Sequence, residues 1–436
     1  MIEKQFCNYN RDYQQRLGFL KVVNYLGEGA RGGPDDILER ARAIFPGGRW
    51  STLVGRPTSP VFDPKALIRR EAVPSWIVGF VPKTLDRLIS WAEMVGLIAQ
   101  SGRLSEWSTI LQGIHHHEGE LDWEADNPFV LSDEERAFFI QLLFYHDQVL
   151  PFLVHHLGGL DAGRSIGVAE SCVLVTRSIG DLYDHIHGNS PNELQLRAEL
   201  RDLLERVGKQ YRLDDPRALV NAEARQDIVK ALAGDRLRGV RVRLAEYHAI
   251  CRFEQLTDLG LLTKEDPENP PVDEGEKEKQ RTSWRWYVAP GLAPAASILR
   301  PHLSDLEPFF QTSWLHFCAA ALVRRAHQVD ALRDQRLIAS LLDATLPLAR
   351  RQLGPVQVHT WASLTCVRAL NQGHLLELQT VGDLLNAMRS DPHTASAVRL
   401  SGRQGLRGRT AAVPKTGLSE VLENHIVSKR TAHGDT

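Results

Sequence analysis

The chain has 436 residues, of which 43% are hydrophobic and 24% charged, a composition typical of a folded protein of roughly two to four domains. Lysine and arginine (52) nearly balance aspartate and glutamate (54), so no overall positive field draws the chain to nucleic acid. No apolar run reaches the ~18 residues of a membrane span, the polar start lacks a secretory signal, and five scattered cysteines form no CxxC. We expect a cytoplasmic protein that does not enter a membrane.

Residues 1–73 form a mixed, partly helical region. A helical pattern over 12–26 ends in a cluster of glycines. Pro34 then opens a short helix through Phe45, because proline suits the first turn and the two aspartates after it favour the positive end of the helix dipole.

Residues 74–130 contain a one-sided helix that starts at Pro82 and Lys83 and ends at Gly96. Glycine can take the left-handed conformation that ends a helix. Leu97 and Ile98 would follow as a first strand, residues 100–103 as a short loop, and residues 104–107 as a return strand.

Residues 131–221 are predicted to be a helical linker domain. Ser132 and Glu135 have the spacing of a capping box, in which each side chain bonds the other residue's backbone N–H. Residues 165–208 carry two more helical patterns, separated by the Gly-Asn-Ser-Pro sequence at 188–191.

Residues 222–300 repeat the arrangement of the 74–130 segment. A helix from Arg241 is broken at Gly260, Leu261-Leu262 form a short strand, a loop rich in Pro, Asp and Glu follows, and residues 284–288 alternate as a second strand.

Residues 301–398 alternate apolar and polar residues at helical period, with a strand-like His374-Leu-Leu after a helix. They are predicted to form a C-terminal helical domain with a partner-binding or dimerising surface. Residues 399–436 form a basic tail, in which glycines at 402, 405 and 408 would keep the backbone flexible.

The 83–107 and 241–288 segments, a helix followed by glycine, strand, loop and return strand, resemble winged helix-turn-helix proteins. The resemblance implies a mostly α fold with tandem winged-helix modules, small β-wings and a helical scaffold between them. In that family the helix before the glycine reads the major groove and the wing touches the adjacent backbone. The second wing departs from the family because its acids outnumber its bases.

Basic side chains on these segments are the predicted contacts to double-stranded DNA. Arginine and lysine bind phosphates, and arginine also reads guanine edges. The tail adds a run of bases with no acid before Glu420, which would lie along a phosphate track. The predicted residues are Lys83, Arg87, Arg103, Arg241, Arg243, His248, Arg252, Arg399, Arg403, Arg407, Arg409 and Lys415.

No catalytic, cofactor-binding or metal-binding residue is assigned. The Walker and Gly-x-Ser-x-Gly signatures are absent, and the glycines at 27, 29 and 32 follow a helical rather than a strand-like run. His115-His116-His117 invites a zinc site, but adjacent residues point in different directions and HExxH is absent, so loop or surface histidines are the favoured interpretation.

The sequence favours the first of three functions, and the other two are alternatives. The first is a non-enzymatic DNA-binding subunit of a bacterial multi-protein system, such as antiviral defence or chromosome or plasmid maintenance, with protein partners and a homodimer as further expectations. The second is an assembly subunit, similar to kleisins or accessory subunits, whose winged helices bind a partner ATPase; the acidic second wing favours it. The third is a metal-dependent nuclease that uses the His115–His117 region.

Overall fold

The computed structural model describes residues 6–7, 9, 16–27, 82–98, 105–118, 130–186, 190–211, 241–264, 285–330, 334–350, 356–390, 399–402 and 409–412. Within these ranges the chain is mostly helical with a few short strands, as the sequence predicts. Among them, no single helix is long and apolar enough to cross a bilayer, and only α7 and α8 taken together reach that length and composition, bent by 115° to each other.

The elements of the amino-terminal two thirds are, in chain order, α1 (Gly18–Leu26), α5 (Pro82–Met94), α6 (Glu106–Glu118), α7 (Asp133–His146), α8 (Val149–Gly158), β1 (Ser165–Gly167), α9 (Val168–Asp184), α10 (Pro191–Tyr211), α13 (Arg241–Asp258), β2 (Leu262–Lys264) and β3 (Arg285–Val288).

The remaining elements are α15 (Leu292–Leu299), η5 (Arg300–His302), α16 (Leu306–Pro308), the π-helix η6 (Phe309–Ser313), α17 (Trp314–Ala321), β4 (His327–Gln328), α18 (Gln335–Ala349), β5 (Val356–Gln357), α19 (Val358–Asn371), β6 (His374–Leu375), α20 (Leu378–Ser390), β7 (Arg399–Gly402) and β8 (Arg409–Ala412).

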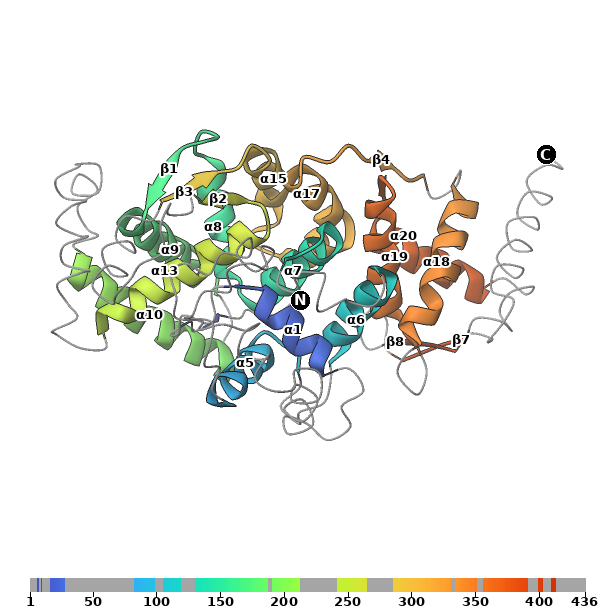
Figure 1. The fold of residues 1–436 in the computed structure, drawn as a ribbon, viewed down its shortest axis with the longest axis horizontal. Helices are drawn as coiled ribbons and strands as arrows, with labels where there is room; N and C mark the ends of the chain where they lie inside the picture. Colours follow the sequence, from blue (N-terminus) through green and yellow to red (C-terminus); the bar gives the residue numbers. More distant parts are fainter. Residues whose placement is uncertain are drawn as a thin grey trace, which may run out of the picture.

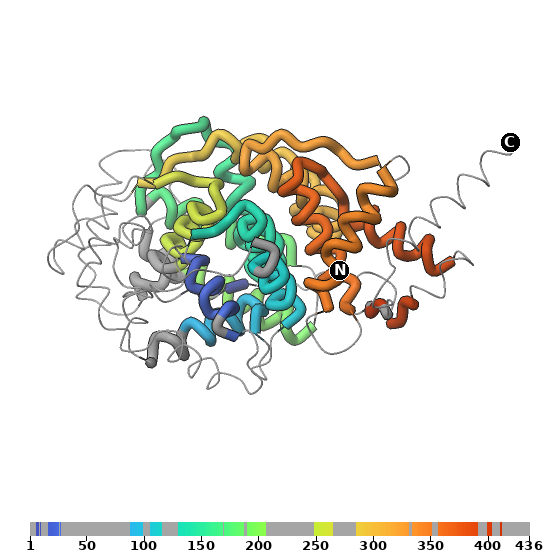
Figure 2. The backbone as a smooth tube through the Cα atoms, turned by 45° about the vertical axis from the view of Figure 1, so that its right-hand side comes forward, coloured from blue at the N-terminus to red at the C-terminus, as the bar shows by residue number. Residues whose placement is uncertain are grey.

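The molecule is elongated, with one small sheet toward each end (Figure 1). The first sheet lies with α8, α9, α10 and α13, and the second lies with α18, α19 and α20. Helices α1, α6 and α7 fill the middle, and the view in Figure 2 keeps this order. Buried apolar side chains from all these parts form one connected core.

The first sheet is antiparallel and has the strand order β1–β3–β2. Ile166 pairs with Trp286 on one side, and Leu262 pairs with Val288 on the other. Trp286 is fully buried, and its ring lies 5.1 Å from that of Phe253 on α13. The sheet therefore closes over α13, which packs on α9 on another side.

The second sheet is also antiparallel and has the order β5–β8–β7. Val356 pairs with Ala411, and Arg399 pairs with Ala412. A separate two-stranded parallel pair, β4 with β6, joins the connection before α18 to the turn between α19 and α20. The strand predicted at His374 is thus confirmed as β6.

Both glycines predicted to end a helix do so in the left-handed conformation, Gly96 with φ +74° and Gly260 with φ +77°. At Gly96 an added Cβ would also lie 2.5 Å from the ring of His146, so a larger residue would strain the backbone and force that ring to move. After Gly260 the predicted strand pair is confirmed as β2 and β3; Trp284 and the loop before it lie outside the described residues.

After Gly96 the prediction of a return strand over 104–107 is wrong. Glu106 and Trp107 are the first residues of α6. The Ser105 hydroxyl accepts the backbone N–H of Ser108 at 3.2 Å, which is an N-cap bond. This cap starts a helix at the position of the predicted strand. Among the described residues of 82–118, only Ile98 has a strand-like bridge.

Two further differences concern strands that the sequence prediction missed. β1 lies at the start of a segment predicted to be entirely helical. The tail predicted to be flexible contains β7 and β8, and β8 pairs with β5, so the boundary set between residues 398 and 399 falls within one sheet. The two helices of residues 165–208 are confirmed as α9 and α10.

Candidate nucleic-acid interface

The two sheets belong to the same succession of elements. The first follows the order α8, β1, α9, α13, β2, β3, with α10 inserted between α9 and α13. The second follows the order α18, β5, α19, α20, β7, β8, with β6 inserted between α19 and α20. In each sheet, the strand that comes last in the chain lies between the other two strands. α13 and α20 therefore occupy equivalent places, each immediately before a β-hairpin.

α13 has no solvent-exposed face over its second half. All nine residues from His248 to Leu256 are buried. They are covered by α9, by the first sheet and by the amino-terminal residues. A helix surrounded in this way cannot enter a DNA groove without unfolding its neighbours.

Arg252 is fully buried and is held by a carboxylate. Its Nε lies 2.9 Å from Asp147 Oδ2, and its Nη2 also donates to the carbonyl of Cys7 at 3.0 Å. The rings of Phe6 and Tyr9 lie 5.4 and 4.8 Å from the guanidinium carbon. Burial alone would lower the pKa of Arg252, but Asp147 reverses this and raises it.

The predicted DNA contacts at His248 and Arg252 are therefore wrong in this structure. His248 stacks on Phe6 at 5.3 Å and is 2% exposed, while Arg252 is an internal ion-pair partner. A buried charge needs a partner, and Asp147 supplies it from a distant part of the chain. Arg241 and Arg243 begin α13, and their side chains lie outside the described ones.

α20 is different, because it has one apolar and one polar face. Leu378, Val381, Leu385 and Met388 are spaced by three or four residues and are buried. The opposite stripe is exposed and wholly polar, and consists of Gln379, Asp383, Asn386 and Ser390, with Arg389 beside it. Such a stripe offers hydrogen-bond donors and acceptors to solvent along the helix.

The hairpin after α20 also has two faces. Ala411 is buried and its cross-strand partner Leu400 packs against the core, whereas Arg399 and Ser401 are exposed. The hydroxyls of Ser401 and Thr410 lie 2.7 Å apart across the strands. The outward face therefore presents an arginine and a pair of hydroxyls, groups that bind phosphate oxygens.

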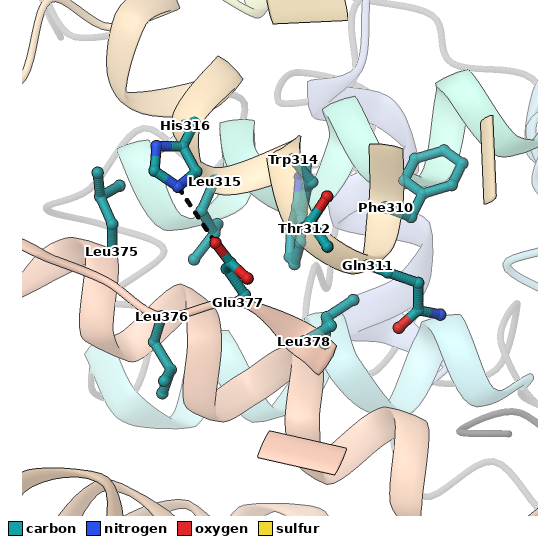
Figure 3. A pocket seen from close by; sticks show the side chains of 10 residues that line it. All are labelled: Phe310, Gln311, Thr312, Trp314, Leu315, His316, Leu375, Leu376, Glu377 and Leu378. Carbon is teal, nitrogen blue, oxygen red and sulfur yellow. Dashed lines mark ion pairs between the residues drawn. The ribbon is translucent and has the colours of Figure 1, made fainter. Parts of the chain in front are cut away.

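The start of α20 lies beside η6 and α17. A pocket with no room for a water molecule lies between η6 and α17 on one side and β6 and the start of α20 on the other (Figure 3). Glu377 accepts from Gln328 Nε2 at 3.3 Å and lies 3.7 Å from His316 Nε2. These contacts fix where α20 begins and leave its exposed stripe uncovered.

The other predicted contacts have mixed outcomes. Arg399 is exposed on β7. Lys83 and Arg87 lie on α5 and Arg409 on β8, but their side chains lie outside the described ones. Predictions for the remaining residues fall outside the described part of the chain; these are Arg103, Arg403, Arg407 and Lys415.

His115 belongs to a buried ion-pair cluster. Its Nδ1 lies 3.0 Å from Glu135 Oε1, and Lys21 Nζ donates to the same carboxylate at 2.9 Å. The predicted capping box of Ser132 and Glu135 is confirmed, so this carboxylate also starts α7. Burial alone would raise the pKa of Glu135, but His115 and Lys21 lower it. Among the described residues, no group of three or more potential ligands is placed to hold a metal ion.

The sequence analysis did not select Gln379, Asn386 and Arg389. Their signal was present: polar residues alternate with a Leu-Val-Leu-Met stripe at helical spacing, just before strands punctuated by glycines. Clusters of basic residues are the usual sequence signal of DNA contacts, and the stripe of α20 contains no such cluster.

Comparisons with protein-family models, with curated proteins and with solved structures found no match to this chain.

Proposed function

We propose that this chain is a non-enzymatic subunit that binds double-stranded DNA through the exposed stripe of α20 and the outward face of the β7–β8 hairpin. The observation that carries the proposal is the contrast between the two equivalent helices. α20 offers a continuous polar surface beside an arginine-bearing hairpin, whereas α13 is enclosed by its own chain.

We further propose that each succession of helix, strand, helix, helix and hairpin is a winged-helix module. Support comes from the element order and from the central position of the last strand in both sheets. The modules then comprise residues 149–288, with an insertion, and residues 335–412. In such a module the helix before the hairpin enters the major groove and the hairpin lies along the backbone.

Electrostatics favours the second module as the binding part. Arg389 and Arg399 are exposed, and the sequence that joins β7 to β8 adds Arg403 and Arg407. Asp383 is the one acid among the exposed residues described on α20. A local surplus of arginines attracts duplex DNA even though the whole chain is almost neutral.

The test measures binding to a labelled random-sequence duplex. Fluorescence anisotropy gives the affinity at salt concentrations from 50 to 200 mM. Affinity should fall steeply with salt. An Arg389→Ala, Arg399→Ala double variant should reduce the slope of log K against log salt by about two, because each phosphate contact contributes about 0.9.

Arg177→Ala is the matched control, since Arg177 is an exposed arginine on α9 in the first module. It should bind as the unchanged protein does. Binding that is absent, that does not respond to salt, or that falls equally in the control would contradict the proposal. A second double variant, Arg403→Ala with Arg407→Ala, should weaken binding in the same direction.

The assembly-subunit alternative has one specific support. Since α13 is enclosed, the first module has no free helix for a groove over residues 248–256 and is suited to structural or partner contacts. Co-purification of the chain with an ATPase, combined with no affinity for duplex DNA, would favour that function.

A further inference from the structure

Asp383 has an unusual position for an acid. It lies near the middle of the exposed stripe of α20, one turn after Gln379 and about one turn before Asn386. The charged residues described nearby on the proposed interface, Arg389 and Arg399, are cationic. Among the described residues Asp383 has no ion-pair partner, and its one hydrogen bond comes from Gln379 Nε2 at 2.8 Å.

The bond from Gln379 has a geometric consequence. It engages Oδ1 of Asp383 and so restrains the carboxylate, while the other oxygen remains available to an incoming donor. The carboxylate is therefore held at the surface as an oriented hydrogen-bond acceptor, and it cannot donate while it is ionised.

An acceptor at this place on a DNA-binding helix acts in two ways. It is repelled by phosphates, so it lowers affinity for DNA in general. Against base edges in the major groove, a carboxylate accepts from the amino group of cytosine and meets only acceptors on guanine and on the O4 edge of thymine. On adenine the amino group lies beside the acceptor N7, which repels the carboxylate, so cytosine is preferred. A carboxylate at this position therefore lowers the affinity for DNA of any sequence and increases the preference for one base over the others.

Resting on the proposed function, we infer that Asp383 is a specificity-determining residue of the interface, which selects a cytosine in the major groove and weakens binding to other sequences. Gln379 acts as its positioning residue. The inference distinguishes Asp383 from Arg389 and Arg399, whose role is attraction to any duplex.

The experiment uses the full chain and the substitution Asp383→Asn, which keeps the side-chain shape and removes the charge. Duplexes from a randomised pool are selected for binding and sequenced, and affinity for a random-sequence duplex is measured by anisotropy. The unchanged protein should enrich cytosine at one position. The variant should lose at least roughly tenfold of that preference, shift it toward adenine, and bind random duplex several-fold tighter.

Glu199→Gln is the matched control. Glu199 is an exposed acid on α10 that accepts from Gln195 Nε2, one turn earlier, at 3.0 Å, so it has the same local arrangement away from the interface. It should change neither preference nor affinity. Gln379→Ala, which frees the carboxylate, should reduce the cytosine preference while it leaves the salt dependence unchanged.

The outcomes separate the two proposals. If the unchanged protein binds no duplex, both fail. If it binds with steep salt dependence but selects no cytosine, or if Asp383→Asn keeps the cytosine preference or weakens binding, the inference about Asp383 is overturned and the DNA-binding function stands.

Discussion

At the scale of single residues, Val323 has a strained backbone conformation. Its φ is +52°, and it is the one residue other than glycine described in the left-handed region. It ends α17, where the N–H of Arg324 bonds the carbonyl of Ala319 at 2.8 Å, the pattern that glycine usually completes. A β-branched side chain is disfavoured there, and this one is 71% exposed, so it gains little from packing.

Val323→Gly should therefore stabilise the protein by about 1 kcal/mol, because the left-handed conformation costs most residues that much and glycine almost nothing. Chemical denaturation followed by circular dichroism measures it. Val130→Gly is the control: Val130 is also exposed and apolar, but φ is not positive there, so it should give no gain. A destabilised Val323→Gly variant would contradict the expectation.

At the scale of elements, α1 is attached to α13 through two buried acids that behave differently. Burial raises the pKa of Asp258 to about 6, against the opposing effect of Arg16, whose Nη2 lies 2.7 Å from the carboxylate. Burial would also raise the pKa of Glu254, but Lys264 at 2.7 Å and Arg16 at 3.3 Å lower it overall.

The two shifts have opposite consequences for stability. Asp258 binds its proton more tightly in the folded protein, so its contribution is favourable at low pH and is lost as pH rises through about 6. Glu254 contributes above its unfolded pKa, and that contribution is lost as pH falls through the lowered value.

Asp258→Asn should remove the first dependence. Relative to the unchanged protein, the variant should gain up to about 3 kcal/mol in free energy of unfolding between pH 4 and pH 8, since two pKa units correspond to about that amount. Urea denaturation at a series of pH values gives the difference. A constant difference across this range would show that Asp258 has the same pKa in the folded and unfolded states.

The sequence predicted local features well and distant ones poorly. Gly96, Gly260 and the capping box at Ser132 depend on neighbours within a few residues, and all three are as predicted. The burial of Arg252 depends on Asp147 and on the Cys7 carbonyl, which are far away in the sequence. No pattern within α13 reveals such partners, so a charged helix was interpreted as a surface helix.

Strand prediction failed for a related reason. β1 has three residues and pairs with β3, from which it is separated in the chain by residues 168–284. A segment this short carries little periodicity, and its pairing is decided by the partner strand. The proposed contact stripe of α20 was not predicted, because Gln379, Asp383, Asn386 and Ser390 are not basic.

At the scale of the whole molecule, α6 joins the second module to the rest. It packs against both α18 and α19 and also against α1 and α7. Gly113 on α6 allows α19 to pack closely against α6, because an added Cβ at this position would lie 2.7 Å from Leu364 Cδ2 on α19. The Nδ1 of His359 on α19 lies 3.0 Å from Oε1 of Glu106 on α6 across the same interface, within hydrogen-bond distance.

Gly113→Val should force α19 away and destabilise the protein by about 1–3 kcal/mol, as overpacking usually does. Calorimetry should show one unfolding transition for the unchanged protein and, for the variant, a lower or divided transition. Gly180→Val on α9 is the matched control, since nothing lies within 4 Å of an added Cβ there. Equal melting of Gly113→Val and the unchanged protein would refute tight coupling through α6.

The central position of β8 also bears on how the protein is made. β5 and β7 both pair with β8 and not with each other. During synthesis they leave the ribosome earlier, so neither has its partner until residues 409–412 emerge. By then α20 has already left the ribosome, but its apolar stripe has no completed sheet to pack against. The second module therefore stays incomplete, and accessible to a chaperone, until residues 409–412 have emerged.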